Sequence, residues 1–383
     1  MDATFDLFAH GPPIGIERVL RLRGPRGVRV VRRAVAVAAI GWGVPFLLLV
    51  ARAIFIEGDA LRSFVADFAV HARSLVAAPI LVFAESICAP RLGAVACHFL
   101  HAGLVPDSER ARFDAAMKST ARLLDVPFAE IGVAVFAYLT VVAMIASDPP
   151  MPAWQVASLT ASSRFSLAGW WHALVSVPLL LVLVFGWLWR VALWARFLWL
   201  VAKIELRLIP AHPDLAAGLK FVGHSLRAFS IVGFALGTIV AGTLANRVSG
   251  GAPVLVCKDA AIGLTVVVAV LFGAPLLVFT HRLLAAWRRG ILEYSALADR
   301  LGRAFETRWI TEEKGRPMLE APDFSAAIDL YSVVGNAYRM KIVPVDYESL
   351  AALIVATLAP IGPVLLLRFP IEVILDELAK LAF

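Results

Sequence analysis

Seven long apolar stretches, separated by polar segments, follow one another along the chain. Each is about 20 residues long, and a helix of that length crosses a hydrocarbon core of about 30 Å. The apolar residues run continuously instead of alternating with polar ones, which disfavours a membrane β-barrel. The pattern therefore predicts an all-α, polytopic transmembrane helical bundle with cytoplasmic helical extensions. The predicted spans are residues 34–56, 75–97, 126–146, 166–189, 229–244, 260–280 and 350–367.

The polar segments complete the predicted organisation. Residues 1–33 form a basic leader without a following small-residue cleavage site, so we expect the first span to be a retained signal anchor. Residues 34–281 form the transmembrane bundle with its connections. Residues 282–349 predict a cytoplasmic helical stalk and a small subdomain. Residues 350–383 hold the last span and a terminal amphipathic helix.

Lys and Arg are crowded in every second connection and sparse in the others. The crowded segments are the leader, 110–122, 190–220 and 282–341. Because cytoplasmic loops carry the excess of basic residues, this alternation predicts a cytoplasmic N-terminus. The C-terminus is then expected outside if the last span crosses the membrane. Pro360 and Pro363 leave a re-entrant last segment as the alternative, which would return the C-terminus to the cytoplasm.

Composition agrees with a membrane location. The 383 residues are 60% hydrophobic and 17% charged, with a mean hydropathy of +0.80, whereas soluble proteins have about 45–50% apolar and about 25% charged residues. The net charge of +7 lies mainly beside the spans, where orientation and anionic lipid headgroups explain it. We therefore expect the lipid bilayer as a partner and no nucleic acid. The three cysteines form no CxxC motif and predict no disulfide framework.

Glu85 is the side chain most suggestive of chemistry, because it lies inside an apolar stretch and is followed by Pro90 and Arg91. An ionised group in a membrane costs about 2.5–3.5 kcal/mol, so it usually faces a cavity or a partner. A carboxylate, a helix break at the proline and a cation predict an ion or proton pathway. Alternatively, the helix ends near Ala89 and both charges extend to the surface. Glu130 is a weaker pathway candidate, since the helix dipole alone accounts for an acid in a first turn.

Five histidines are expected near the cytoplasmic side: His98, His101, His212, His224 and His281. Their spacing matches no zinc motif, and no pair lies deep within two spans as a membrane haem requires. We therefore expect hydrogen-bonded interface histidines, with no metal and no cofactor. His212, Asp214 and His224 leave a lipid-acting enzyme as the least favoured activity, although a His-Pro-Asp triplet also suits a turn.

Two further patterns concern helix packing. The helix after the sixth span carries an apolar seam over about three heptads, which predicts an oligomer seam or docking on the chain's own helix at 110–122. Its principal positions are Leu284, Trp287, Ile291, Tyr294, Leu301 and Phe305. In the fifth span, Gly233 and Gly237 predict close packing against another helix.

Three segments resemble sequences of an uncharacterised family of bacterial polytopic inner-membrane proteins. They are Leu92–Asp107 (LGAVACHFLHAGLVPD), His212–Gly223 (HPDLAAGLKFVG) and Arg339–Pro360 (RMKIVPVDYESLAALIVATLAP). The resemblance implies a bacterial cytoplasmic membrane location and no particular activity, so no functional residue follows from it.

Function is predicted mainly from Glu85 and the apolar seam. The chain lacks the motifs of P-loop, dinucleotide-binding, zinc-protease and serine-hydrolase enzymes. The leading hypothesis is a channel or transporter-like protein that moves an ion or small solute as a homo-oligomer. The alternative is a non-conducting membrane sensor or scaffold that binds a cytoplasmic protein partner, because most of the polar residues are expected on that side.

Overall fold

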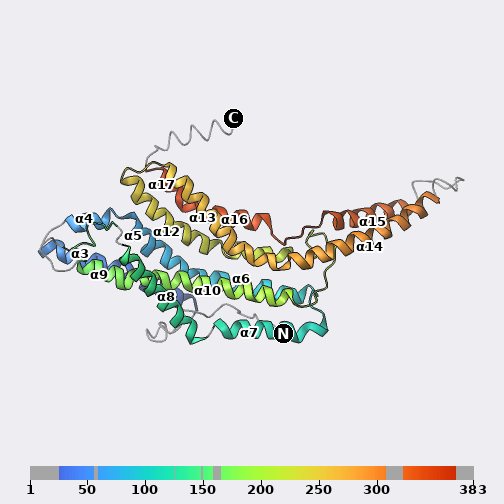
Figure 1. The fold of residues 1–383 in the computed structure, drawn as a ribbon, viewed down its shortest axis with the longest axis horizontal. Helices are drawn as coiled ribbons and strands as arrows, with labels where there is room; N and C mark the ends of the chain where they lie inside the picture. The colour runs from blue at the N-terminus through green and yellow to red at the C-terminus, as the bar shows by residue number, and fades with distance from the viewer. Residues whose placement is uncertain are drawn as a thin grey trace.

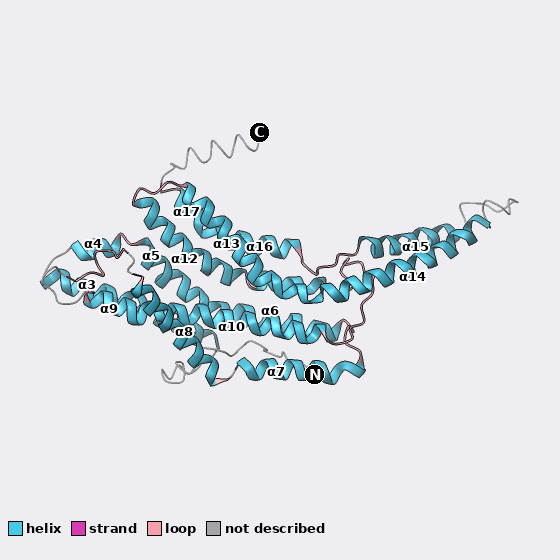
Figure 2. Ribbon diagram, viewed as in Figure 1, coloured by secondary structure: helices cyan, strands magenta, loops and turns pink. Residues whose placement is uncertain are grey.

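The computed structural model describes residues 26–55, 59–124, 126–147, 150–157, 165–307 and 322–367. The described part of the chain is helical apart from loops and turns, and it contains no strand. The helices form an elongated bundle from which one helical hairpin extends (Figures 1 and 2). The first part of the predicted leader and the predicted terminal amphipathic helix lie outside the described residues.

Seven described helices are long and apolar enough to cross a membrane, which confirms the predicted all-helical class and the presence of seven apolar helices of membrane length. Each candidate span is built from the following helices, in chain order: α2 (Arg26–Ala38) with α3 (Val44–Phe55); α5 (Phe68–His71) with α6 (Ala78–His101); α8 (Pro127–Ala146); α9 (Leu167–Trp171) with α10 (Val177–Ala202); α11 (His224–Ala228) with α12 (Ser230–Ser249); α13 (Leu255–Gly273) with α14 (Thr280–Glu306); and α16 (Tyr347–Leu358) with α17 (Gly362–Leu365). The remaining helices are α4 (Asp59–Val65), α7 (Arg110–Leu124) and α15 (Pro322–Arg339).

Polar caps fix where three of the spans begin. Asp67, Ser166 and Asp346 each accept hydrogen bonds from backbone N–H groups in the first turns of α5, α9 and α16. A carboxylate or hydroxyl at this position satisfies N–H groups that have no partner within the helix. α8 begins at Pro127, where a proline loses no helical hydrogen bond.

The second and fourth spans are longer than a membrane is thick. At about 1.5 Å per residue, Phe68–His101 and Leu167–Ala202 are each about 50 Å long, against a hydrocarbon core of about 30 Å. The neighbouring span α8 begins at Pro127, and its first turns pack beside Trp189 and Ala192 of α10. We therefore place the end of the surface expected to meet lipid near Trp189. Both helices therefore continue about 20 Å beyond that level.

The continuing helices form a second packed layer, which we call the cap layer: the last turns of α6 and α10, with α7, α11 and the start of α14. Its core is aromatic, with neighbouring ring centroids 4.9–6.1 Å apart. The rings belong to Phe99, Phe113, Phe197, Phe221 and Phe279. The basic, aromatic extension of the fourth span thus stands as a continuous helix packed on α7, where Arg196 donates to the hydroxyl groups of Ser119 and Thr120.

Pro90 does not end a helix, contrary to the predicted break. α6 runs through it from Ala78 to His101. Cys88, Ala89 and Leu92 are buried on the packed side of α6, while Pro90 lies on the exposed side. The hydrogen bond lost at the proline therefore falls outside the core, and packing on both sides of it maintains the helix.

The last apolar helix runs the full length of α12. It begins beside Gly223, where a Cβ atom would contact Asp346, and it ends where Ile361 and Val364 pack against Val248. The helix from Tyr347 to Leu365 is long and apolar enough to cross a membrane, and a re-entrant segment stays the alternative prediction. A Cβ atom at Gly233 or Gly237 would collide with Thr357, because α12 and α16 approach closely there. The predicted role of the GxxxG sequence in packing is confirmed.

α14 and α15 form an antiparallel hairpin that extends beyond the bundle (Figure 1). The Ser295 and Tyr338 hydroxyl groups are 2.6 Å apart, and Gly302 lies beside the Tyr331 hydroxyl. The predicted apolar seam of α14 is half-buried, with α15 of the same chain as its packing partner. The prediction considered a second copy or the 110–122 helix and missed this partner, because periodicity reveals an apolar face but not what covers it. Assembly into an oligomer stays a prediction.

Candidate functional site

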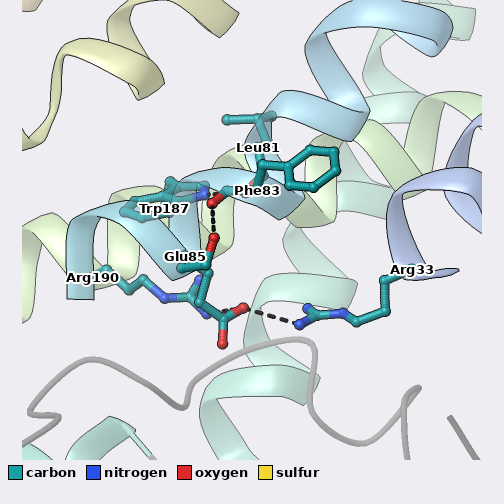
Figure 3. Close-up of polar contacts among 7 residues, drawn as sticks. Arg33, Leu81, Phe83, Glu85, Trp187 and Arg190 are labelled. Atoms are coloured by element: carbon teal, nitrogen blue, oxygen red, sulfur yellow. Dashed lines mark hydrogen bonds and ion pairs between the residues drawn. The ribbon is translucent and has the colours of Figure 1, made fainter. Parts of the chain in front are cut away.

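Glu85 lies between two arginines from other helices, as Figure 3 shows. Its Oε2 atom is 3.2 Å from Arg33 Nη1 on α2 and 3.6 Å from Arg190 Nη2 on α10. The side chains of Glu85, Arg33 and Arg190 are 16%, 8% and 4% exposed, respectively. Trp187 lines the same place, with its Nε1 donating to the Leu81 carbonyl at 2.9 Å and the Arg190 guanidinium 5.1 Å from its ring centroid.

We call the part of the bundle outside the cap layer, where the candidate spans have apolar outer surfaces, the apolar layer. The charge cluster of Arg33, Glu85 and Arg190 lies near one boundary of this layer and not at its middle. Glu85 follows Phe68 by about 25 Å of helix, and Arg190 follows Leu167 by about 35 Å, which are both close to a hydrocarbon thickness. Arg33 directly precedes the first apolar residues. Three helices are therefore joined by one carboxylate at the level where the apolar layer meets the cap layer.

The structure does not assemble the rest of the predicted pathway. Arg91 lies on the exposed side of α6, and six residues after Glu85 it falls on a different helix face. Glu130 is half-buried in the first turn of α8, which packs on α10. The cations that do meet Glu85 were missed, since Arg33 was counted with the leader and Arg190 with the loop. Comparing helix depth would have found them, because each of the three residues lies about 25–35 Å of helix from the opposite end of its apolar span.

A second polar cluster, also not predicted, lies at the other end of the apolar layer. Asp67 accepts hydrogen bonds from Trp154 Nε1 at 2.9 Å and Asn246 Nδ2 at 2.7 Å, besides the N–H groups of Ala69 and Val70. Burial raises the pKa of Asp67, but the hydrogen bonds, first those from Asn246 and Trp154, outweigh it and hold the pKa below its ordinary value. Through these hydrogen bonds, Asp67 links the loop that contains Trp154, and Asn246 of α12, to the start of the second span.

Three π turns meet beside that second cluster: Ala39–Gly43, Ala72–Ala77 and His172–Ser176. Single π turns often occur at functional sites. Among the described residues, His172 Nδ1 and Ser176 Oγ are buried without a hydrogen-bond partner. Between this level and Glu85, however, Ala77 at the end of its π turn and Leu81 and Ala84 on α6 are buried, at no more than 1% exposure. The two polar clusters are thus separated by an apolar section.

The cap layer contains a solvent-open cavity of about 340 Å³ with a basic lining, which we call the basic cavity. Three of the five predicted interface histidines line it: His98, His212 and His224. The other two, His101 and His281, are exposed outside its lining. The charged residues of the lining are Arg207, Lys220 and Asp214. The sequence pattern placed these histidines at one end of the molecule but gave no means of seeing that they converge.

A tightly folded loop, residues 203–219, forms one wall of the basic cavity. Its Leu215 and Ala217 have positive φ angles of 57° and 54°, which non-glycine residues rarely adopt. The Asp214 carboxylate compensates for this strain by accepting hydrogen bonds from the N–H groups of Ala216, Gly218 and Lys220. Burial raises the Asp214 pKa, but these three bonds and a contact with His212 outweigh it, so the pKa lies below its ordinary value.

The cavity has the chemistry of an anion site more than of a metal or hydrolytic site. The described residues contain no group of three His, Cys, Asp or Glu side chains that would hold a metal ion. His212 Nδ1 is 2.8 Å from Asp214 Oδ1, and no nucleophilic side chain belongs to the lining. The remaining polar residues of the lining are basic, Arg207 and Lys220 together with His98 and His224, and such side chains suit an anion.

Two of the three segments quoted in the sequence analysis line this cavity, and the third lies behind it. Residues 92–107 and 212–223 line it, and residues 339–360 support it through Asp346, which is 3.6 Å from Lys220 Nζ. Comparison with protein-family models, with curated proteins and with solved structures found no match to this chain.

Proposed function

We propose that this chain is a non-conducting sensor or scaffold of the bacterial cytoplasmic membrane, with the N-terminus, the cap layer and the α14–α15 hairpin in the cytoplasm. The orientation rests on the crowding of Lys and Arg in the connections at that end. A ligand in the basic cavity would be the input, and a protein bound to the hairpin would receive the output. The transport hypothesis stays a prediction that the experiment below decides.

The observation that carries this proposal is the contact of the cavity wall with both ends of the hairpin. Pro210 in the 203–219 loop packs directly against Gly290 of α14. Lys341, just after α15, donates its backbone N–H to the Leu215 carbonyl at 2.7 Å. A ligand that shifts this loop therefore acts on both helices of the hairpin at their bases.

The interior of the bundle supports the non-conducting part of the proposal. Glu85 forms ion pairs with two arginines. It does not line the basic cavity, and it does not line the apolar groove between α8 and α10 that Phe136 and Phe185 border. The buried Ala77, Leu81 and Ala84 separate it from the polar cluster at Asp67. An ion crossing this section would lose its hydration without protein ligands, which is strongly unfavourable.

The hairpin supplies a surface for a partner. Leu292 on α14 and Ile328 on α15 are 74% and 69% exposed outside the apolar layer. Large apolar side chains in such a position are typical of protein-binding surfaces. A lipid-acting enzyme is less well supported, because His98 lies about 20 Å further along α6 than Glu85, beyond the depth of the headgroups.

Ion flux into liposomes that contain the purified protein tests conduction. We expect wild type and Glu85→Gln to show the flux of empty liposomes under K⁺, Cl⁻ and proton gradients. Flux through wild type that Glu85→Gln abolishes would overturn the proposal in favour of a channel or transporter.

Photo-crosslinking in intact cells tests the scaffold part. A photoreactive amino acid at Leu292 should give a protein adduct, whereas the same group at Val266, which is 56% exposed on the apolar surface of α13, should not. Identical adducts from both positions, or none from either, would contradict a dedicated hairpin partner.

A further inference from the structure

The lining of the basic cavity contains two side chains that are cationic at neutral pH, Arg207 and Lys220, and one acid, Asp214. Three histidines, His98, His212 and His224, add further hydrogen-bonding groups to the lining. A neighbouring acid, Asp346, lies behind Lys220. Whether the lining favours an anionic ligand therefore depends on how far its two acids are already satisfied within the protein.

Both acidic side chains already have hydrogen-bond donors. The Asp214 carboxylate accepts from three backbone N–H groups and contacts His212. Asp346 Oδ2 caps α16 by accepting from the N–H and hydroxyl of Ser349, at 3.1 and 2.6 Å. Neither carboxylate needs a bound cation, so the basic side chains of the lining remain as the groups that could hold a charged ligand, and they favour an anion.

Arg207 is the donor best placed to bind that anion. Its backbone N–H donates to the Leu104 carbonyl at 2.8 Å, which fixes the residue on the rim formed by the end of α6. Its side chain is exposed, and no ion pair involves it among the described residues. A guanidinium group held by its backbone and lacking an acidic partner is suited to bidentate binding of phosphate oxygens.

The size and the apolar walls indicate a ligand larger than a free inorganic ion. A volume of about 340 Å³ is at the lower end of small-molecule sites, about 300–1,000 Å³. Phe221, with its ring centroid 4.4 Å from that of His98, lines the cavity together with Leu104 and Ile209. These walls would contact the non-phosphate part of a ligand.

From this geometry we infer that the basic cavity binds a phosphomonoester group, with Arg207 and Lys220 holding its oxygens and the surrounding histidines donating to them. The inference rests on the proposed function, because it takes the cap layer to face the cytoplasm. The same chemistry has two sources, a soluble phosphorylated molecule and the headgroup of phosphatidic acid. The distance of about 20 Å between Glu85 and His98 favours the soluble source.

Isothermal titration of the full-length protein in nanodiscs distinguishes these sources. The probes are ribose 5-phosphate, ribose as the uncharged control, and nanodiscs with or without phosphatidic acid. We expect ribose 5-phosphate to bind and ribose not to bind. Arg207→Gln should weaken the binding by about tenfold, because charge-assisted hydrogen bonds are lost. Arg207→Lys should recover part of it, which shows that the site still folds.

Arg227→Gln is the matched control, since Arg227 is exposed on α11 outside the cavity lining, and it should bind like wild type. A phosphatidic acid effect that Arg207→Gln removes, without binding of the sugar phosphate, would support the same site with a lipid as its source. Absence of both effects, or equal binding by wild type and Arg207→Gln, would overturn the inference. If the titration shows no binding of ribose 5-phosphate and the liposomes show no ion flux, this inference fails but the sensor proposal is not contradicted. If the liposomes show flux that depends on Glu85, the sensor proposal fails, whatever binds in the basic cavity.

Discussion

At Glu85 one carboxylate holds three helices together, since Arg33 comes from α2 and Arg190 from α10. Sequence alone identified the carboxylate, because an acid inside an apolar stretch is conspicuous. It did not identify the two cations, because each stands beside other basic residues in the sequence. The adjacent Arg91 was the obvious partner and is the wrong one, since side-chain direction on a helix is decided by the helical repeat and not by proximity in sequence.

Replacing Glu85 should therefore destabilise the fold. We expect Glu85→Gln to lower the free energy of unfolding by about 3 kcal/mol, because breaking a buried ion pair removes the charge that compensates for burying its partners. Reversible unfolding in detergent, followed by tryptophan fluorescence, measures the change. Arg91→Gln is the control, and as an exposed substitution it should change stability by no more than about 0.5 kcal/mol. Equal effects of the two substitutions would show that the ion pairs contribute little.

Asp214 predicts how the cavity loop depends on pH. Its pKa in the folded protein lies below the ordinary value of 3.8, so its stabilising effect is fully present above pH 3.8 and is lost as the pH falls through the lower, folded value. Asp214→Asn should lower the melting temperature at pH 7, and the difference from wild type should shrink below pH 3.8. Asp299→Asn, at an exposed position of α14, should show no such trend. A constant difference between wild type and Asp214→Asn at all pH values would contradict the assignment.

At the scale of helices, apolar periodicity predicted the elements well and their partners poorly. The GxxxG of α12 was expected to pack closely, and it meets Thr357 of α16. For α14 the seam was correct as an apolar face, but its partner is α15, whose weaker pattern gave no comparable signal. Pro90 misled the prediction because tertiary packing on both sides of it outweighs the local cost of a proline.

The close approach of α12 and α16 can be tested with one methyl group. Gly237→Ala should destabilise the protein by about 1–3 kcal/mol, because the added Cβ would collide with the backbone carbonyl of Thr357. Gly263→Ala on α13 has open space around the new methyl group and should be neutral or slightly stabilising. Thermal unfolding of both variants in the same detergent makes the comparison. A neutral Gly237→Ala would show that the two helices are further apart.

The junction of the hairpin and the cavity predicts coupled mobility. In Gly290→Ala the new methyl group would collide with Pro210, so the 203–219 loop must move. We expect faster hydrogen exchange at the N–H groups of Gly218 and Lys220, which Asp214 now protects. Gly335→Ala on α15, where a Cβ meets nothing within 4 Å, should leave the exchange unchanged. If both variants exchange like wild type, the hairpin does not act on the loop.

On the scale of the whole molecule, about two thirds of α6 and about half of α10 lie beyond the level of Glu85 and Arg190 and belong to the cap layer. Hydropathy could not reveal this division, because the cap layer has an aromatic core of its own and its helices stay apolar on their packed faces. Trp187 lies at the level of the Arg33–Glu85–Arg190 cluster, with the Arg190 guanidinium 5.1 Å from its ring centroid, and tryptophan is enriched at membrane interfaces. Position along the helices, and not hydropathy, therefore separates the apolar part of the bundle from the cap layer.

A spin label measures directly how deep each part of α6 lies. Ala94 and Val76 are both exposed positions of the second span, one beyond Glu85 and one before it. After the three cysteines are replaced by alanine, a label at Ala94→Cys should be relaxed mainly by a water-soluble nickel complex, and a label at Val76→Cys mainly by oxygen dissolved in lipid. This follows because Ala94 lies about 14 Å past the boundary at Glu85. Oxygen-dominated relaxation at both positions would place all of α6 in the bilayer. It would also bring the basic cavity to headgroup depth, where phosphatidic acid becomes the favoured source of its phosphate.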